Sequence, residues 1–161
     1  MKALFDTSVW IDHLRNGTLD EVVSEMRGRV VLAMDAVTAA ELRAGPTSIR
    51  ERRAVDRLLA PFDRAERVWV AGLGDYARAG RALSTLRSSG RTLRRPAGAL
   101  LDALIAAVAA REGAWLFTHN SADFEKLATV LPFAHGTVSN LRAMLRSARH
   151  SRLIPDPTRQ P

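Results

Sequence analysis

Short apolar runs alternate along this chain with segments of helical pattern, and this alternation restricts the possible folds more than any other feature of the sequence. The run at residues 30–34 (VVLAM) is continuous, which is typical of a strand buried on both faces of a parallel sheet. Similar strands are predicted at residues 1–5, 68–70 and 115–118. Strands that alternate with helices predict an α/β fold, in which a parallel sheet lies between helices and the crossovers are right-handed.

Capping residues, glycine and proline set the expected helix boundaries. The segment Thr38-Ala39-Ala40-Glu41 fits the capping-box pattern, so a helix is predicted to begin at Thr38 and to end near Arg43, before a Gly-Pro pair. Further helices are predicted at residues 7–16, 19–26, 48–59, 76–86, 97–112 and 139–150. The three prolines of residues 154–161 predict a loose tail.

The length and composition are those of one globular domain. A chain of 161 residues can bury roughly two thirds of its unfolded surface in a single core. Cysteine is absent, which excludes disulfide scaffolds, zinc ribbons, iron–sulfur sites and thiol catalysis. The longest apolar run, residues 97–110, is too short to cross a bilayer, and the first residues lack the apolar stretch of a secretory signal. We therefore expect a cytoplasmic protein with no membrane segment.

The chain is basic, and most of its positive charge comes from arginine. Its 24 Lys and Arg residues against 17 Asp and Glu give a formal net charge of +7, which points to a polyanionic partner. All but two of the basic residues are arginine, and residues 78–95 contain six arginines and no acidic residue. A solvated helix face has the same appearance, so the run does not by itself identify a binding surface.

Four carboxylate residues are candidates for a metal site. Asp6 follows the first predicted strand, and Asp123 follows the fourth. Glu41 lies in the helix after the second strand, and Asp102 lies inside the apolar helix. Ligands of a parallel α/β fold collect at the carboxyl ends of the strands, so all four side chains can face one edge of the sheet. Such oxygen ligands bind Mg²⁺ or Mn²⁺, which clamp the attacking and leaving oxygens in phosphoryl transfer.

Each acid also has a simpler structural explanation, and Asp102 fits its explanation least well. Asp6 and Asp123 stand at helix starts, and Glu41 stands at the third position of a capping box, where acids are favoured without any ligand. Asp102 lies among apolar residues and has no basic residue at helical spacing. Burying an unpaired carboxylate is costly, so a bound metal is favoured over an exposed flank or a contact with a backbone donor.

Other catalytic motifs are absent or weak. The sequence contains no Walker loop, no Gly-x-Ser-x-Gly elbow and no His-Glu-x-x-His motif. Residues 72–77 imitate a dinucleotide-binding glycine turn, but they follow the third strand and lack the acid that would bind the ribose. A strand-to-helix turn explains these glycines without a ligand.

Four motifs occur in order along residues 4–124. They are LFDTSVWI at 4–11, VTAAELRAG at 37–45, DALIAA at 102–107 and THNSADF at 118–124. Together these motifs resemble those of PIN-domain ribonucleases, and the chain is most similar to the VapC toxins of bacterial toxin–antitoxin pairs.

The resemblance implies which residues form the active site. It implies Mg²⁺ or Mn²⁺ as the cofactor, with catalytic and metal-binding roles for Asp6, Glu41, Asp102 and Asp123. Thr118 and Asn120 are implied as auxiliary contacts. Asn120 stands where some PIN domains carry another acid, which leaves open whether the site holds one metal or two.

The resemblance also implies an architecture and partners. It implies a three-layer α/β/α PIN-like domain, with a parallel sheet of four or five strands, over residues 1–136. Residues 137–161 would add a C-terminal basic helix and a proline-containing tail. The family further implies a homodimer, and a cognate antitoxin that places a basic side chain among the carboxylates.

These expectations combine into one hypothesis, a metal-dependent endoribonuclease that acts as the toxin of a toxin–antitoxin system. In this hypothesis a metal-activated water hydrolyses an RNA phosphodiester bond. The RNA backbone would be bound, with salt-sensitive affinity, by Arg43, Arg87, Arg91, Arg94 and Arg95. Two alternatives stay open: a non-catalytic PIN module that binds RNA or protein, and a DNA-directed nuclease of the same fold.

Overall fold

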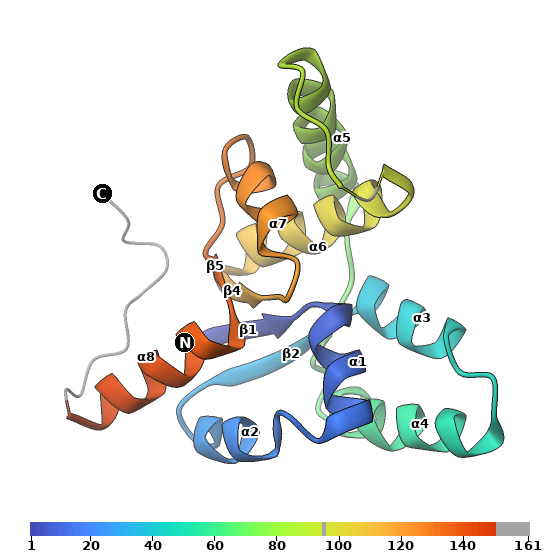
Figure 1. Ribbon diagram of the computed structural model, residues 1–161, viewed down its shortest axis with the longest axis vertical. Helices are drawn as coiled ribbons and strands as arrows, with labels where there is room; N and C mark the ends of the chain where they lie inside the picture. Colours follow the sequence, from blue (N-terminus) through green and yellow to red (C-terminus); the bar gives the residue numbers. More distant parts are fainter. Residues whose placement is uncertain (95, 151–161) are drawn as a thin grey trace.

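A five-stranded parallel sheet forms the centre of the molecule, with helices on both of its faces (Figure 1). The coordinates are a computed structural model, and they describe residues 1–94 and 96–150. The strand order is β3-β2-β1-β4-β5, and every neighbouring pair is parallel. The strands are β1 (Lys2–Phe5), β2 (Val31–Asp35), β3 (Val68–Trp69), β4 (Ala114–Phe117) and β5 (His135–Gly136). The three-layer α/β/α fold is therefore confirmed, with five strands.

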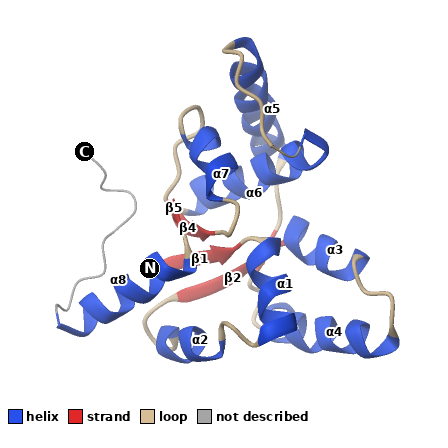
Figure 2. Ribbon diagram, in the orientation of Figure 1, coloured by secondary structure: helices blue, strands red, loops and turns tan. Residues whose placement is uncertain are grey.

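Helices connect the strands and alternate with them along the chain (Figure 2). A single turn of 3₁₀ helix, η1 (Pro96–Gly98), precedes the apolar helix. The helices are α1 (Thr7–Asn16), α2 (Asp20–Met26), α3 (Ala36–Ala44), α4 (Ile49–Arg64), α5 (Leu73–Ser88), α6 (Ala99–Glu112), α7 (Ser121–Ala128) and α8 (Val138–His150). Most predicted helices are found within a few residues of their expected bounds.

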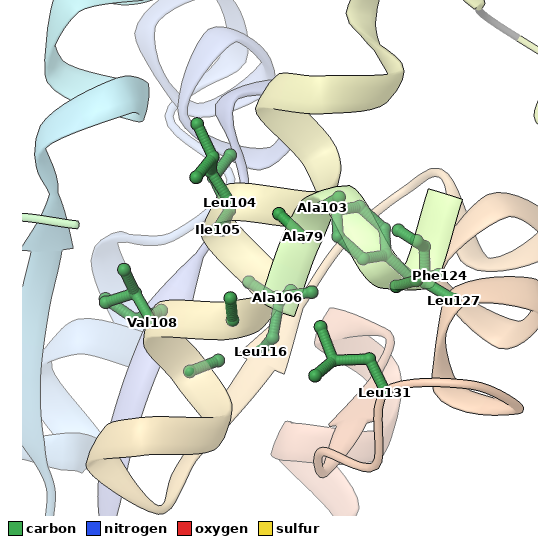
Figure 3. Close-up of a cluster of buried hydrophobic side chains, with 14 of the residues drawn as sticks. Ala79, Ala103, Leu104, Ile105, Ala106, Val108, Leu116, Phe124, Leu127 and Leu131 are labelled. Atoms are coloured by element: carbon green, nitrogen blue, oxygen red, sulfur yellow. The ribbon is translucent and has the colours of Figure 1, made fainter. Parts of the chain in front are cut away.

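The sheet separates two hydrophobic cores, and successive residues of β1 point into different ones, as a strand's period of two requires. Leu4 belongs to the core formed with α5, α6 and α7, part of which is shown in Figure 3. Ala3 and Phe5 belong to the core formed with α1, α2, α4 and α8. Helix α6 is buried along residues 103–109 because it packs on α5 and α7 as well as on the sheet. This surrounds α6 with apolar contacts and fixes the helix that carries Asp102.

The register brings the carboxyl ends of β1 and β4 to the same level. Phe5 pairs with Phe117, and the backbone N–H of Asp6 donates to the carbonyl of Phe117 at 2.9 Å. Asp6 and Thr118 therefore leave the sheet side by side. In Figure 1, α1 and α3 start at the arrowheads of β1 and β2, so both helices begin at this edge of the sheet.

The predicted start of α3 at Thr38 is wrong. The helix begins at Ala36, and Asp35 is its N-cap, because the Asp35 carboxylate accepts a hydrogen bond from the backbone N–H of Val37 at 2.8 Å. Thr38 is a fully buried residue inside the first turn. Glu41 is consequently not the third residue of a capping box, so the structural explanation first available for it does not apply.

The C-terminal helix is packed into the second core. Leu141 and Leu145 of α8 are completely buried there. The division of the chain at residue 136 stays a prediction, and the tail predicted at residues 154–161 lies outside the described residues. Over the described ranges 1–94 and 96–150, no helix has the length and apolar character that crossing a membrane requires.

Candidate active site

Asp6 is the centre of the hydrogen bonds at the carboxyl edge of the sheet. As N-cap of α1, its Oδ1 accepts from the backbone N–H of Thr7 at 2.7 Å. Its Oδ2 accepts from the hydroxyl of Ser8 at 2.6 Å and from the hydroxyl of Thr118 at 2.9 Å. The residue is 5% exposed. Three hydrogen bonds, two from α1 and one from the residue that follows β4, fix the orientation of this carboxylate.

Among the described residues, the carboxylate of Asp6 has no cationic neighbour. Across residues 1–94 and 96–150, no Lys, Arg or His nitrogen lies within 4.0 Å of its oxygens. Neutral hydroxyl and amide donors stabilise a buried carboxylate without cancelling its charge. Asp6 therefore lies, without a cationic partner in the described ranges, at the edge where ligands of this fold collect.

Glu41 is joined to Asp6 through Thr7. The hydroxyl of Thr7 donates to Oε2 of Glu41, which reaches across from α3. Glu41 is partly buried, and within the described part of the chain it has no ion-pair partner either. It also lines a groove of about 260 Å³ between α1, α3 and α4, whose apolar side chains include Ile11, Leu14 and Val55.

Asp123 is completely buried, and both of its carboxylate oxygens are engaged. Oδ1 accepts from the backbone N–H of Arg94 at 2.8 Å, and Oδ2 accepts from the side-chain amide of Asn120 at 3.1 Å. The Nζ of Lys126 lies 3.9 Å from Oδ1. The backbone N–H of Asn120 donates to the Thr118 hydroxyl at 2.8 Å, so hydrogen bonds run without a break from Asp123 to Asp6.

Asp102 is less buried than the sequence suggested. It lies in the first turn of α6, directly after η1, and its side chain is partly exposed. A carboxylate at a helix N-terminus is favoured by the helix dipole, and solvent contact lowers the cost of its charge. The expectation that Asp102 is enclosed by apolar residues is therefore wrong in degree, because the residue lies in the first turn of α6 with its side chain partly exposed.

The structure does not bring these four acids into one compact set of metal ligands. No group of three or more His, Asp or Glu side chains in residues 1–94 and 96–150 lies close enough to hold a metal ion. Hydrogen bonds instead link Asp6 to Glu41 through Thr7, and Asp6 to Asp123 through Thr118 and Asn120. The atoms available as metal ligands are carboxylate, hydroxyl and amide oxygens, which suit hard cations such as Mg²⁺ and Mn²⁺. The uncompensated charges of Asp6 and Glu41 fit the same chemistry.

The sequence analysis missed two contributors that directly contact the candidate carboxylates. Ser8 donates to Asp6 and accepts from the backbone N–H of His119 at 3.2 Å, so it ties α1 to the segment after β4. Thr7 bridges Asp6 and Glu41. Thr7 and Ser8 follow Asp6 directly, so the three form a run of capping-type residues after a strand, a pattern that predicts a helix start and does not predict these contacts.

Two buried aspartates close to β2 and β3 were also missed. Burial raises the pKa of Asp35 to about 6, opposed by the backbone N–H groups of Val37 and Thr38 and by the charge of Arg111. Its Oδ2 has no hydrogen-bond partner within the described part of the chain. Asp75 is 1% exposed and forms ion pairs with Arg78 and Arg111.

The arginines predicted to bind RNA are exposed where the structure describes them. Arg87, Arg91 and Arg94 have no acidic ion-pair partner among the described residues. Arg43 lies 3.4 Å from Asp63 in an exposed pair. Arg95 falls outside the described residues.

Comparison with solved structures finds the same architecture in toxin–antitoxin complexes. VapBC-1 from nontypeable Haemophilus influenzae is 25% identical, with a TM-score of 0.64 over 86% of this chain and 99% of that chain. VapBC-5 from Mycobacterium tuberculosis is 26% identical, with a TM-score of 0.56 over 84% of this chain and 98% of that chain. VapBC2 from Rickettsia felis, bound to a promoter DNA fragment, is 18% identical with a TM-score of 0.67, over 85% and 98% of the two chains, and shows the fold alone.

Sequence comparisons give one further result each. A search of the curated proteins finds no match. The family model of the PIN domain matches residues 3–130, which include all four candidate carboxylates. This chain therefore belongs to the PIN domain family.

Proposed function

We propose that this protein is a VapC-type toxin, a metal-dependent endoribonuclease that hydrolyses RNA phosphodiester bonds. The observation that carries the proposal is the buried carboxylate of Asp6, which is held by hydroxyl donors, has no cationic partner in residues 1–94 and 96–150, and is joined to Glu41 through Thr7. Membership of the PIN family and likeness to VapBC complexes support a nuclease of the toxin type.

The residues that would hold Mg²⁺ or Mn²⁺ are Asp6, Glu41, Asp102 and Asp123. A carboxylate oxygen has more than one lone pair, so the hydrogen bonds that Asp6 and Asp123 accept leave capacity for a cation. The chemistry that the metal supplies when bound is neutralisation of the phosphate charge and activation of water for attack. Ser8, Thr118 and Asn120 orient the carboxylates through the hydrogen bonds described above.

The RNA chain would be held by charge rather than by a deep pocket. Exposed guanidinium groups form salt-sensitive contacts with phosphate oxygens and do not read sequence. We assign this role to Arg43, Arg87, Arg91, Arg94 and Arg95. Since carboxylates repel RNA, these arginines supply the attraction that the site itself lacks.

The partners follow from the relatives, which are complexes of a toxin with its antitoxin. We propose a homodimer and a cognate antitoxin in the cytoplasm. The groove between α1, α3 and α4 is lined mainly by apolar residues, and Glu41 is one of its lining residues. An antitoxin segment with apolar side chains and one basic side chain matches this groove, because the basic group can pair with Glu41.

The deciding experiment is a digest of single-stranded RNA at increasing Mg²⁺ concentration, with Asp102→Asn as the control. We expect cleavage that requires the dication and is lost in the variant, because the substitution removes charge and keeps shape. Cleavage by Asp102→Asn at the wild-type rate contradicts the site assignment. Absence of cleavage in every metal favours the non-catalytic module, and preferential cleavage of a single-stranded DNA of matched sequence favours the DNA-directed nuclease.

A further inference from the structure

Residues 91–94, here called the basic loop, are fastened to α7 by several contacts. The Nζ of Lys126 donates to the carbonyl oxygen of Thr92 at 2.8 Å. The backbone N–H of Arg94 donates to Asp123 at 2.8 Å, and the guanidinium of Arg91 lies 3.5 Å from the hydroxyl of Thr129. The loop contains neither helix nor strand, so these contacts and its packing define its position.

A buried leucine completes the attachment. Leu93 is 6% exposed and belongs to the hydrophobic core that also contains Phe124 and Leu127 of α7. The labelled side chains of Phe124 and Leu127 point into this core in Figure 3. The side chains of Arg91, Thr92 and Arg94 are exposed. The loop therefore buries one residue and presents its two arginines to solvent.

The attachment is continuous with the candidate active site. Arg94 contacts Asp123, Asp123 contacts Asn120, and from there the hydrogen bonds continue through Thr118 to Asp6. Two residues after Arg94 the chain enters η1, which leads into α6, whose first turn carries Asp102. The basic loop is therefore joined to Asp123 by a hydrogen bond and precedes Asp102 along the chain.

We propose that Lys126 is a positioning residue, which fastens the basic loop to α7 and thereby holds Arg91 and Arg94 where they contact the phosphates of a single-stranded RNA at the active site. This inference rests on the proposed function. Lys126 acts through the loop and not through RNA, because its ammonium donates to Thr92 and lies beside Asp123.

The ammonium group of Lys126 contacts other groups of the protein, whereas the arginines of the basic loop have no acidic ion-pair partner among the described residues. Its side chain is 37% exposed and lies near the fully buried carboxylate of Asp123. Lys2 offers a matched comparison, since its Nζ forms a 3.0 Å ion pair with Glu112 and its side chain is 46% exposed. Lys2 is the first residue of β1 and lies at the opposite end of that strand from Asp6. Replacing either lysine removes one positive charge, but only Lys126 contacts the loop.

The first experiment measures the affinity for a short fluorescent single-stranded RNA in an Asp102→Asn background, which prevents cleavage. We expect Lys126→Met and Arg94→Gln each to raise Kd by about fivefold, the loss of a salt-sensitive phosphate contact. We expect Lys2→Met to leave Kd within about twofold, and Lys126→Arg to restore binding. The Kd of the double variant Lys126→Met, Arg94→Gln should equal that of Lys126→Met, because a displaced loop no longer presents Arg94.

If the Kd of the double variant is raised by the product of the two single-variant factors, the proposal is overturned, because Lys126 would then be an independent phosphate contact. The second experiment needs no RNA: limited trypsin digestion of the protein, with the fragments identified by mass. Trypsin cuts after arginine, and we expect Lys126→Met, but not Lys2→Met, to be cut faster after Arg91 and Arg94. Unchanged cleavage in a variant that folds normally also overturns it.

The two proposals can fail separately. If the wild type cleaves no RNA in any metal while Lys126→Met still releases the loop and weakens RNA binding, the nuclease assignment fails and the role of Lys126 stands. If metal-dependent cleavage occurs and Lys126→Met changes neither Kd nor proteolysis, the nuclease assignment stands and the role of Lys126 fails.

Discussion

Two buried aspartates in this protein differ in how their charge is compensated. Asp75, 1% exposed, accepts a hydrogen bond from the backbone N–H of Gly72 at 2.8 Å and pairs with the guanidinium groups of Arg78 and Arg111. Asp6, 5% exposed, accepts from two hydroxyls and one backbone N–H and has no cationic partner in the described ranges. Both carboxylates accept hydrogen bonds on both of their oxygens, so hydrogen bonding does not distinguish them.

Under the proposed function, the difference separates a structural carboxylate from a candidate metal ligand. The ion pairs of Asp75 join the start of α5 to the end of α6, and nothing further is needed to stabilise the charge. The charge of Asp6 is oriented by neutral donors and left available at the sheet edge, which is the arrangement a bound cation requires. Under the proposed function, the lack of a cationic partner in the described ranges, rather than burial, distinguishes Asp6 from Asp75.

The largest expected effect is on catalysis by Asp6. We expect Asp6→Asn to reduce Mg²⁺-dependent RNA cleavage by at least about a hundredfold, since metal binding needs the negative charge. The free energy of unfolding should change by less than about 1 kcal/mol, because the Ser8 and Thr118 hydroxyls can rotate to suit an amide. Cleavage assays and thermal unfolding of the same preparation check both. A large loss of stability with cleavage retained would show that Asp6 is structural.

The second expected effect is on stability and comes from Asp75. We expect Asp75→Ala to lower the free energy of unfolding by about 3 kcal/mol, because it leaves two guanidinium groups without their partner. Cleavage by the protein that remains folded should be unchanged. Asp63→Ala is the control, because its pair with Arg43 is exposed on both sides and should contribute less than about 1 kcal/mol. Equal effects of the two variants in denaturant titration would contradict the comparison.

The sequence predicted the fold because the fold depends on local patterns. Continuous apolar runs and capping residues identified the strands that pair in the centre of the sheet. β5 was not identified, since two residues have no periodicity and His135 becomes a strand only by pairing with Leu116. The start of α3 was misplaced because Asp35 and Thr38 are both good caps three residues apart. The helix is capped by Asp35, which is the last residue of the buried strand β2.

The sequence pattern identifies some residues of the candidate site for the same reason. Asp6 was recognisable because it directly follows a strand. Its link to Glu41 through Thr7 spans 34 residues, and the contact of Arg94 with Asp123 spans 29 residues. Such contacts depend on how helices pack and on the path of a loop, which residue patterns do not specify. The pairing of Asp75 with Arg111 is likewise a tertiary contact, so the sequence could not tell a compensated aspartate from an uncompensated one.

The pH dependence of stability tests the comparison at Asp35, a third buried aspartate. One of its carboxylate oxygens has no hydrogen-bond partner among the described residues. Its pKa is raised to about 6, mainly by burial, from an ordinary value of 3.8. The folded state therefore binds the proton more tightly than the unfolded state. This contribution to stability is complete below about pH 4 and is lost as the pH rises through about 6.

We expect the wild type to lose about 2 kcal/mol across this interval relative to Asp35→Asn, in which the group cannot titrate. Denaturant titrations of both proteins at several pH values measure the difference. The amide keeps an oxygen for the N–H of Val37, so the cap of α3 is retained in the variant. Parallel pH profiles would mean that Asp35 has an ordinary pKa and that its charge is compensated after all.

The smallest expected effect separates two buried threonine hydroxyls. Thr118 donates to Asp6 and accepts from the backbone N–H of Asn120, whereas the hydroxyl of Thr38 has no partner within the described residues. We expect Thr118→Val to cost about 1 kcal/mol of stability and to slow cleavage by about tenfold, because Asp6 loses a donor that orients it. Thr38→Val should be neutral or slightly stabilising, since it removes an unsatisfied polar atom. If both variants fold equally well and cleave at the wild-type rate, the hydroxyl of Thr118 does not position Asp6, and the orientation of that carboxylate must come from α1 through Thr7 and Ser8.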